Sequence, residues 1–329
     1  MKKRGKGIAC FFYGMGNTGK PNPSSAIVEM MQDGSANVLC GVADIGQGST
    51  TVMSQIAAQE LGIPLESVSI VTADTGVTTE SGVTSATRQT YISGNAVRLA
   101  AQDAKEQLFQ EAVRIIKGGV EVMDAKDGYI FLKNYPDRRV SVGEVVYKCW
   151  QQGKVIIGRG NFNPPISPLD DETGQGVPYG AYTYGTMVAE VEVDTETGVV
   201  TVLKLTGSQD AGKAINPMSV EGQLEGGAAM GIGFCLSEEV VLDKGKIKNP
   251  DFKEYLIPTA LDMPEVDVII VESADPTGPF GANGVGEPAN VPVAASILNA
   301  IANALGCRVK ELPCTAERLF KVLQEQGLN

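Results

Sequence analysis

Alternation of apolar and polar residues predicts two β-hairpins in this sequence. In the first, strands over residues 26–31 and 37–42 flank an Asp-Gly turn. In the second, alternating residues 189–193 and a β-branched run over 199–205 flank a turn that also contains glycine. Single strands are predicted at 68–72 and near residues 254 and 267.

Apolar residues at helical spacing predict helices over residues 49–61, 95–117 and 290–305, and each run ends at a glycine. A fourth segment, 219–235, differs from these three. Glycine recurs there about once per helical turn, at Gly222, Gly226, Gly227 and Gly231. Because glycine lacks a side chain, this pattern lets a helix lie close against another backbone or a ligand.

The order of these elements favours an α+β fold, with mixed sheets and packed helices, over a doubly wound parallel sheet. Residues 124–182 are richer in Gly, Pro, Asp and Tyr and predict a long irregular excursion. The length of 329 residues suits two domains. We place their boundary near residue 175, which gives domains 1–175 and 176–329.

Composition narrows the function. With 27 Lys and Arg against 39 Asp and Glu, the net charge of −12 disfavours nucleic acid and anionic membrane surfaces as partners. No apolar run is long enough to span a membrane, and the residues after Met1 lack the apolar core of a signal peptide. We therefore expect a cytoplasmic chain with reduced thiols.

The absence of histidine removes Ser-His-Asp and Cys-His nucleophile pairs, and it removes the common zinc sites. The six cysteines form no C-x-x-C pair, which argues against an iron–sulfur cluster held by this chain. Glycine makes up 39 of 329 residues, well above the usual share, and points to many close backbone approaches. A large bound cofactor would explain them.

Three segments are candidates for chemistry. Residues 14–20 match G-x-G-x-x-G, but Pro21-Asn22-Pro23 follows where a phosphate-binding helix would begin, so a flexible loop is favoured. Residues 44–50 combine a strand end, a glycine turn and a helix start, which suits a polar, phosphate-bearing ligand or simply a capped helix. Residues 278–288 surround Glu287 with glycines. Either another molecule packs against the Glu287 carboxylate, or the carboxylate makes a favourable contact with a helix dipole.

Together these segments resemble the molybdenum-binding part of the xanthine dehydrogenase and aldehyde oxidase family, over almost the whole chain. The matching motifs are residues 4–7, 33–35, 45–48, 82–89, 94–96, 210–217, 222–226, 281–288 and 312–317.

The resemblance implies two molybdopterin-binding domains, the second of which carries the loop of the catalytic Glu287. In such enzymes a pterin dithiolene holds the molybdenum, so the chain supplies no direct metal ligand. Residues that match the family's pterin contacts are Gly46, Gln47, Gly48, Ser49, Thr84, Ser85, Ala86, Thr87, Arg88, Gln89 and Gln223. Tyr13, Asn17 and Thr18 fall where the family has a substrate-pocket loop.

The resemblance also implies a reaction, which is hydroxylation of an electron-poor carbon with oxygen from water. Glu287 is expected to take the proton of a metal-bound hydroxyl while hydride passes to a terminal sulfide or selenide. Such a base requires that no cation lower its basicity. Consistent with this, no Lys or Arg lies between Lys253 and Arg308.

The family's molybdenum subunits are about twice this length, which implies a partner. We expect a large molybdopterin subunit that supplies the other half, an iron–sulfur subunit and an FAD subunit that passes electrons to NAD(P). This division is similar to that of bacterial nicotinate dehydrogenases, so an aromatic N-heterocycle such as nicotinate is the favoured substrate, and a cytosine dinucleotide pterin the favoured cofactor. A purine or aldehyde hydroxylase of the same family stays open, as does a non-catalytic scaffold subunit.

Overall fold

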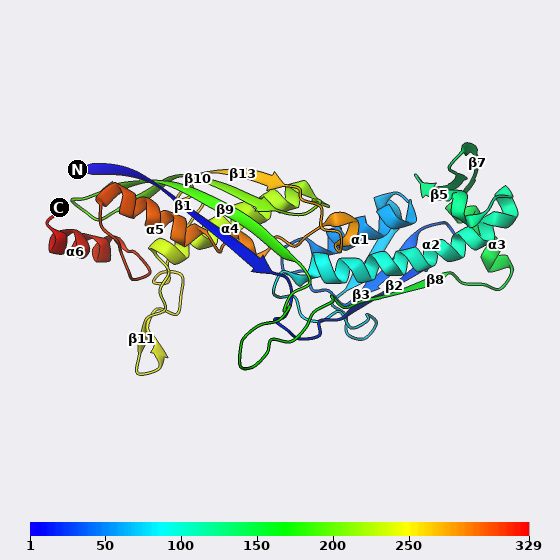
Figure 1. Ribbon diagram of the computed structural model, residues 1–329, viewed down its shortest axis with the longest axis horizontal. Coiled ribbons are helices and arrows are strands. Elements are labelled where there is room, and N and C mark those ends of the chain that lie inside the picture. Colours follow the sequence, from blue (N-terminus) through cyan, green and yellow to red (C-terminus); the bar gives the residue numbers. More distant parts are fainter. Residues whose placement is uncertain (329) are drawn as a thin grey trace. The chain divides into compact units, whose positions relative to one another are not determined.

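The computed structural model describes residues 1–328 and divides into two compact units (Figure 1). Unit 1 comprises Met1–Tyr13, Thr183–Ser273 and Val285–Asn329. Unit 2 comprises Gly14–Tyr182 and Ala274–Gly284. Each unit has its own sheet and helices, so the α+β fold class expected from the sequence is confirmed.

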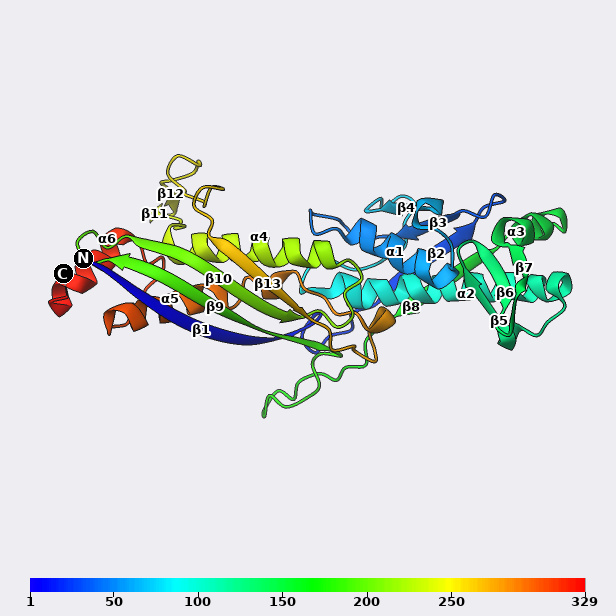
Figure 2. The same cartoon turned by 90° about the horizontal axis from the view of Figure 1, so that it is seen from above.

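Unit 1 is built on a four-stranded sheet in the order β1-β9-β10-β13. The predicted hairpin is confirmed as antiparallel β9 and β10, and β13 runs parallel to β10. Helix α4 lies along this sheet (Figure 2). The elements of unit 1 are β1 (Lys2–Gly14), β9 (Tyr182–Asp194), β10 (Val200–Asp210), α4 (Pro217–Leu236), β11 (Leu242–Asp243), β12 (Lys246–Ile247), β13 (Glu265–Val271), the 3₁₀ turn η5 (Glu287–Ala289), α5 (Val293–Leu305) and α6 (Ala316–Gln326).

The core of unit 1 forms where the inward residues of β9 meet α4, α5 and α6. Val191 and Val193 are fully buried, as are Ile297 and Ile301 of α5. Two glycines of β1, Gly5 and Gly7, allow α5 to approach closely, since a side chain on either would collide with α5 at Ala300.

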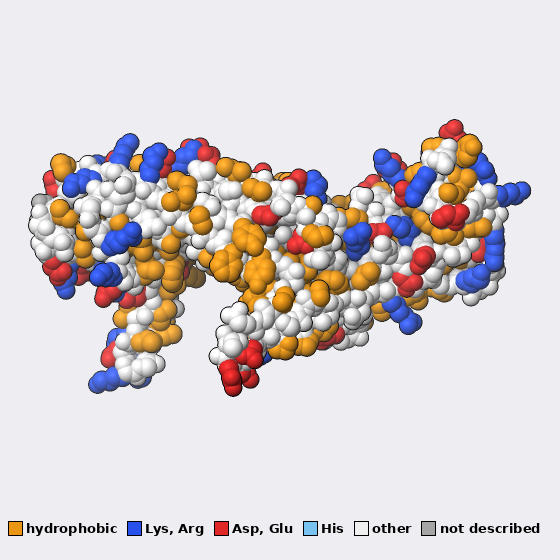
Figure 3. All heavy atoms as spheres, in the orientation of Figure 1, with side chains coloured by type: hydrophobic (Ala, Val, Ile, Leu, Met, Phe, Trp, Pro, Cys, Tyr) orange, Lys and Arg blue, Asp and Glu red, His pale blue; other side chains and the backbone are white. Residues whose placement is uncertain are grey.

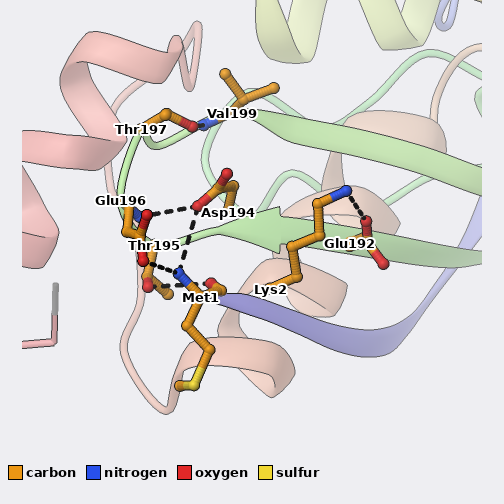
Figure 4. Close-up of polar contacts among 8 residues, drawn as sticks. All are labelled: Met1, Lys2, Glu192, Asp194, Thr195, Glu196, Thr197 and Val199. Carbon is orange, nitrogen blue, oxygen red and sulfur yellow. Dashed lines mark hydrogen bonds and ion pairs between the residues drawn. The ribbon is translucent and has the colours of Figure 1, made fainter.

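Polar contacts join the start of β1 to β9 and to the turn that follows it (Figure 4). The backbone oxygen of Met1 accepts a hydrogen bond from the amide of Thr195 at 2.9 Å. Lys2 lies 2.8 Å from Glu192, and hydrogen bonding to Lys2 and Arg4 lowers the pKa of Glu192. Lys2 and Arg4 are largely exposed, although Glu192 is not, so each pair stabilises the strand only weakly.

Unit 2 contains a sheet in the order β4-β3-β2-β8, in which antiparallel β2 and β3 are the other predicted hairpin. Helix α2 packs on β8, where Gly158 and Gly160 leave room for the α2 backbone at Ala100 and Ala96. The elements are β2 (Ser24–Met30), β3 (Ala36–Cys40), α1 (Ser49–Leu61), η1 (Leu65–Ser67), β4 (Val68–Thr72), the π turn η2 (Gln89–Ser93), α2 (Gly94–Ile116), η3 (Val120–Val122), β5 (Met123–Lys126), β6 (Tyr129–Leu132), β7 (Tyr135–Ser141), α3 (Val142–Gln151), β8 (Ile157–Phe162) and η4 (Pro279–Gly281).

The prediction of an irregular excursion over residues 124–182 is wrong for its first two thirds. Strands β5, β6 and β7 form a three-stranded sheet, and β8 joins the main sheet of unit 2. Helix α3 buries Val142, Val145 and Cys149 and begins at Ser141, whose hydroxyl accepts from the amide of Glu144. The sequence signal is weak here because β5 and β6 have only four residues each and β7 is mostly polar, while β8 depends on pairing with β2, more than 100 residues away.

Of the other predicted helices and strands, six are confirmed and one is wrong. The four predicted helices are confirmed as α1, α2, α4 and α5, and the strands at 68–72 and near 267 as β4 and β13. The strand near residue 254 is wrong, because residues 252–255 form turns. Strand β1 and helix α6 were not predicted. None of the helices in residues 1–328 is long and apolar enough to cross a membrane.

The division into domains at residue 175 stays a prediction. The two units are drawn differently from a single cut, since β1 pairs with β9 and so belongs to unit 1. Residues 274–284 return to unit 2, where Thr277 accepts from Asn95 at 2.8 Å through its carbonyl oxygen and hydrogen-bonds Tyr91 at 2.8 Å through its hydroxyl.

Candidate functional site

In unit 2, the loop before α1 is shaped by two glycines. Gly46 and Gly48 have φ values of 106° and 82°, in the left-handed region that favours glycine. Between them, the Gln47 side chain folds back on its own loop. Its Oε1 accepts from the amide of Ile45 at 2.7 Å, and its Nε2 donates to the carbonyl of Ala43 at 3.1 Å.

Asp44 holds the other end of this loop. Its carboxylate accepts hydrogen bonds from the amides of Gly46, Gly48 and Thr50 at 2.9–3.2 Å. Burial by itself would raise the pKa of Asp44, but these amide groups together lower it below its usual value. Asp44 therefore caps α1, whose N-cap Gly48 has no side chain, and these three amides already have a partner within the chain.

The Gln47 loop meets the predicted motif at Thr84–Gln89 through a chain of partly buried polar side chains. Thr84 Oγ1 donates to the carbonyl of Ala43 at 2.9 Å, which is the same oxygen that Gln47 contacts. Gln89 Nε2 donates to Thr84 Oγ1 at 2.8 Å, and Gln89 Oε1 accepts from Ser93 at 2.7 Å. The structure thus brings Gln47, Thr84 and Gln89 together, and their contact with a pterin stays a prediction.

Arg88 is fully buried, and its guanidinium bonds to the protein itself. Nε donates to Asn22 Oδ1 at 2.7 Å, Nη2 to the carbonyl of Pro23 at 2.9 Å, and Nη1 to the carbonyls of Ser81 and Val83. Burial lowers the pKa of Arg88. Every guanidinium nitrogen has a carbonyl or amide oxygen as partner, so Arg88 fixes the loop from within.

The backbone of this motif is strained at two neighbouring positions. Ala86 and Thr87 have φ values of 50° and 56°, and a π turn follows at η2. The amide of Gly16 donates to the carbonyl of Ala86 at 2.8 Å, and Gly284 lies so close to Thr87 that a side chain there would collide. Non-glycine residues adopt such angles where the surroundings force them, which is common at binding sites.

The remaining predicted residues of unit 2 lie at its surface. Ser85 is exposed, and so is Asn17. Thr18 is exposed and its hydroxyl lies 2.5 Å from the hydroxyl of Tyr179. Tyr13 belongs to unit 1 instead: it is the last residue of the segment Met1–Tyr13, lies in β1 and is half-buried.

In unit 1, Glu287 begins the 3₁₀ turn η5 and is exposed in the chain. Helix α4 supports this turn by close backbone packing. A Cβ on Gly227 would lie 2.6 Å from the Cβ of Ala289, and one on Gly231 would collide with Val293. Gln223, one turn before Gly227, is half-buried, and its Oε1 lies 3.9 Å from where a Cβ on Gly286 would stand.

Three buried side-chain atoms in residues 1–328 have no hydrogen-bond partner within the chain, and all lie in or beside the motifs. Ser49 Oγ lies at the start of α1, Asn283 Oδ1 in the 281–288 motif, and Gln209 Oε1 at the end of β10. Gln209 Nε2 donates to the carbonyl of Val285 at 3.5 Å, two residues before Glu287. Unpaired buried polar atoms are rare and fit a polar ligand such as a pterin.

Sequence reasoning missed Gln209, Asn283 and Asn22. Asn283 stands inside the motif at 281–288, which could have identified it. Gln209 and Asn22 gave no local signal, because their importance rests on burial against segments 60–80 residues away.

The comparisons with known proteins agree with the motifs. Residues 1–264 match the family described as the molybdopterin cofactor-binding domain. The putative xanthine dehydrogenase molybdenum-binding subunit of Escherichia coli is 32% identical over 99% of this chain and 43% of its own length. Subunit gamma of the 6-hydroxypseudooxynicotine dehydrogenase complex of Paenarthrobacter nicotinovorans is 31% identical over 92% of this chain and 37% of its own length.

Among solved structures, quinoline 2-oxidoreductase from Pseudomonas putida 86 is similar with a TM-score of 0.88 and 28% identity. The similarity covers 98% of this chain and 42% of that chain. The chain therefore spans less than half the length of the proteins that it matches.

Proposed function

We propose that the chain forms part of a molybdenum-dependent hydroxylase. The premise is that it belongs to the molybdopterin cofactor-binding domain family and to the molybdenum-binding subunits of the xanthine dehydrogenase type. The observation that carries this proposal is the coincidence of the family motifs with the partly buried polar network of Gln47, Thr84 and Gln89. A globular chain without a ligand has no need to gather strained backbone and unpaired buried atoms at these loops.

The residues proposed to hold the pterin are Gly46, Gln47, Gly48, Ser49, Thr84, Ser85, Ala86, Thr87, Arg88, Gln89 and Gln223. Among these, Ser49 Oγ has no partner within the chain and is available to a pterin or phosphate oxygen. Arg88 acts through the loop that it fixes, since its guanidinium is already bonded. A cytosine dinucleotide pterin with a terminal sulfide or selenide is the cofactor form that we propose.

The overall reaction converts R–H and water into R–OH, two protons and two electrons. When bound, the molybdenum group supplies the hydroxylating and electron-accepting chemistry. Glu287 is proposed to take one of the two protons on its carboxylate oxygen. The short turn η5 and the packing of Gly227 against Ala289 fix the position of its backbone, while Gln209 steadies Val285.

The proposed substrate is an aromatic N-heterocycle, with hydroxylation of nicotinate to 6-hydroxynicotinate as the favoured case. The names of two similar proteins, which specify quinoline and 6-hydroxypseudooxynicotine, support this class. A purine remains the alternative that the name of the Escherichia coli protein supports. Tyr13, Asn17 and Thr18 are proposed as substrate neighbours.

We further propose partners for this chain in a cytoplasmic complex. A large molybdopterin subunit would contribute the part of the family protein that this chain does not span, and iron–sulfur and FAD subunits would pass electrons to NAD(P). Two observations support the first partner: the chain covers 37–43% of its longer relatives, and one of them is named as a subunit of a complex.

The test is the purified complex that carries Glu287→Gln, with Glu325→Gln at an exposed position of α6 as the matched control. We expect Glu287→Gln to retain molybdenum while kcat on nicotinate falls by about 10²–10⁴-fold, the usual contribution of a general base. The control should keep both metal and turnover. Near-normal turnover of Glu287→Gln would remove the base role, and a metal-free wild-type complex would favour a scaffold subunit.

A further inference from the structure

Helix α4 carries an exposed row of residues spaced four apart, which is the kind of ridge that packs into the groove of another helix. Three of these residues are large and apolar, with exposed fractions of 56–76%. The row consists of Met218, Gly222, Gly226, Met230 and Phe234.

The two glycines of this row have no explanation within the chain. A Cβ on Gly222 or Gly226 would meet no atom within 4 Å, whereas Gly227 and Gly231 pack against Ala289 and Val293. A glycine in an exposed helix interior destabilises the helix relative to alanine. Glycine at positions 222 and 226 therefore indicates that another polypeptide approaches the α4 backbone closely there.

Residues 237–264, here called the arm, continue this apolar surface after α4. The arm contains the small β11–β12 hairpin and projects from unit 1 (Figure 1). Figure 3 shows hydrophobic side chains along it. Its large apolar residues are roughly half to fully exposed; they are Val240, Val241, Leu242, Ile247, Phe252, Leu256, Ile257 and Leu261.

The arm is an ordered element held by polar contacts. Asn249 joins its two sides, donating through Nδ2 to the carbonyl of Glu239 at 2.6 Å and accepting from the amide of Val241 at 2.9 Å. Tyr255 donates to Glu238 at 2.7 Å, and Arg318 of α6 fixes the base of the arm through Glu239 at 2.7 Å. Its shape is thus defined while its apolar side chains stay uncovered.

The arm also contains a concavity of about 240 Å³, lined mainly by apolar side chains that include Val240, Ile247 and Phe252. Its tip is basic, because Lys244, Lys246 and Lys248 are all exposed there beside the single acidic Asp243. An apolar surface with a charged rim is typical of a protein interface.

We propose that the outer row of α4 and the arm together form the surface on which the remaining part of the molybdenum-binding subunit packs. This inference rests on the proposed function. The family match runs from residue 1 to residue 264 and so includes both α4 and the arm. The matching proteins cover 92–99% of this chain yet are more than twice as long. The part of each relative that lies outside the match is the rest of that subunit, and this part is the proposed occupant.

The proposed partner surface has a stated chemistry. It presents a helix or strand backbone to Gly222 and Gly226, apolar side chains to the arm, and acidic residues to the lysines of the tip. A second copy of this chain is the competing occupant, since its net charge of −12 would also attract a basic tip.

The test uses the complex of this chain with the co-expressed family polypeptide that carries the part it does not span. In the first variant, Phe252→Ser and Leu261→Ser are combined, and the control combines Val155→Ser with Val199→Ser, two exposed residues outside the surface. We expect the arm variant to raise the Kd about tenfold or more and the control to leave it unchanged. Amide exchange in the arm should slow in the wild-type complex.

The second variant, Gly226→Leu, separates docking from stability. It should raise the unfolding temperature of the isolated chain by about 2 °C, because leucine favours a helix more than glycine does, and yet it should weaken the complex about tenfold or more. Gln324→Leu on α6 is its control, because it places a leucine at an exposed helix position outside the surface.

The outcomes separate this inference from the proposed function. A complex that forms with cofactor and is unaffected by either variant would overturn the docking surface while the proposed function stands. Failure of the wild-type chains to associate at all would overturn both. Self-association of the isolated chain that the arm variant abolishes, seen by sedimentation, would assign the surface to a second copy and overturn the inference.

Discussion

The two units hold their motif loops by different physical means. In unit 2 the loops at 43–49 and 82–89 are tied by partly buried hydrogen bonds through Thr84. The fully buried Arg88 holds the second loop from within by bonding to Asn22 and to loop carbonyls. In unit 1 the turn at Glu287 is held by close backbone packing, in which α4 places Gly227 against Ala289. A polar network specifies the direction of each donor and acceptor, whereas close packing fixes a backbone position and leaves the side chain exposed.

This difference matches the roles proposed for the two units. A pterin is recognised by oriented donors and acceptors, which the network of unit 2 can keep in place. A general base requires a carboxylate at a fixed position that remains accessible, which η5 provides for Glu287. The following changes test the comparison, beginning with the one of largest expected effect.

Replacing Arg88 with methionine should destabilise unit 2 by about 3 kcal/mol or more, because several buried carbonyl groups lose a charged donor. The measurement is native-state amide exchange along α2, which begins next to the network. Arg114→Met is the control, since Arg114 is 66% exposed and pairs only with Glu111 among the ion pairs of the structure; its effect should stay below about 1 kcal/mol. Equal effects of the two variants would refute the structural role of Arg88.

Gly227→Ala and Gly226→Ala add the same methyl group to neighbouring positions of α4 with opposite results. At Gly227 the methyl group would lie 2.6 Å from Ala289 Cβ and 2.8 Å from the Ala289 backbone, so overpacking should outweigh the gain in helix propensity. At Gly226 it meets nothing, and the isolated chain should become more stable. We expect the two variants to differ by about 2 kcal/mol in the free energy of unfolding, measured by urea denaturation. Similar values would contradict the packing account of unit 1.

Asp44→Ala should destabilise the start of α1 by about 1 kcal/mol at pH 7, the usual value of a lost cap. Because folding lowers the pKa of Asp44, its stabilising effect is complete above its unfolded pKa of about 3.9 and disappears as the pH falls through the folded value. The difference in stability between wild type and variant should therefore shrink below about pH 4. Asp44→Asn, which keeps an acceptor without titrating, should show no such change, and an equal difference at pH 7 and pH 3 would rule out the charge.

The sequence predicted the parts of the fold that carry a strong local signal. Helices α1 and α2 combine apolar spacing with a glycine at or near their ends, and both hairpins have glycine turns. It failed where the signal was weak or non-local. Strand β1 is stabilised by pairing with β9, some 180 residues away. Strands β5 and β7 contain too few apolar residues to alternate clearly, and β6 is only four residues long.

In the candidate site, too, the residues with a local sequence signal were predicted and those that depend on distant contacts were not. Motif resemblance pointed to Gln47, Thr84 and Gln89, and the structure joins them through Ala43. Resemblance placed Arg88 among the pterin contacts, but its guanidinium binds Asn22 and loop carbonyls. Gln209 escaped notice because burial and a distant carbonyl, that of Val285, give it its importance.

What the sequence by itself determined is the identity of the local elements and the family motifs, because both depend on residues that are close along the chain. Only the tertiary structure decided which glycines of α4 face the core and which face outward, and which polar side chains bond within the protein. The physical reason is that close packing and hydrogen bonding are satisfied by neighbours in space. Gly227, Arg88 and Gln209 each have such a neighbour 60 residues or more away in the chain.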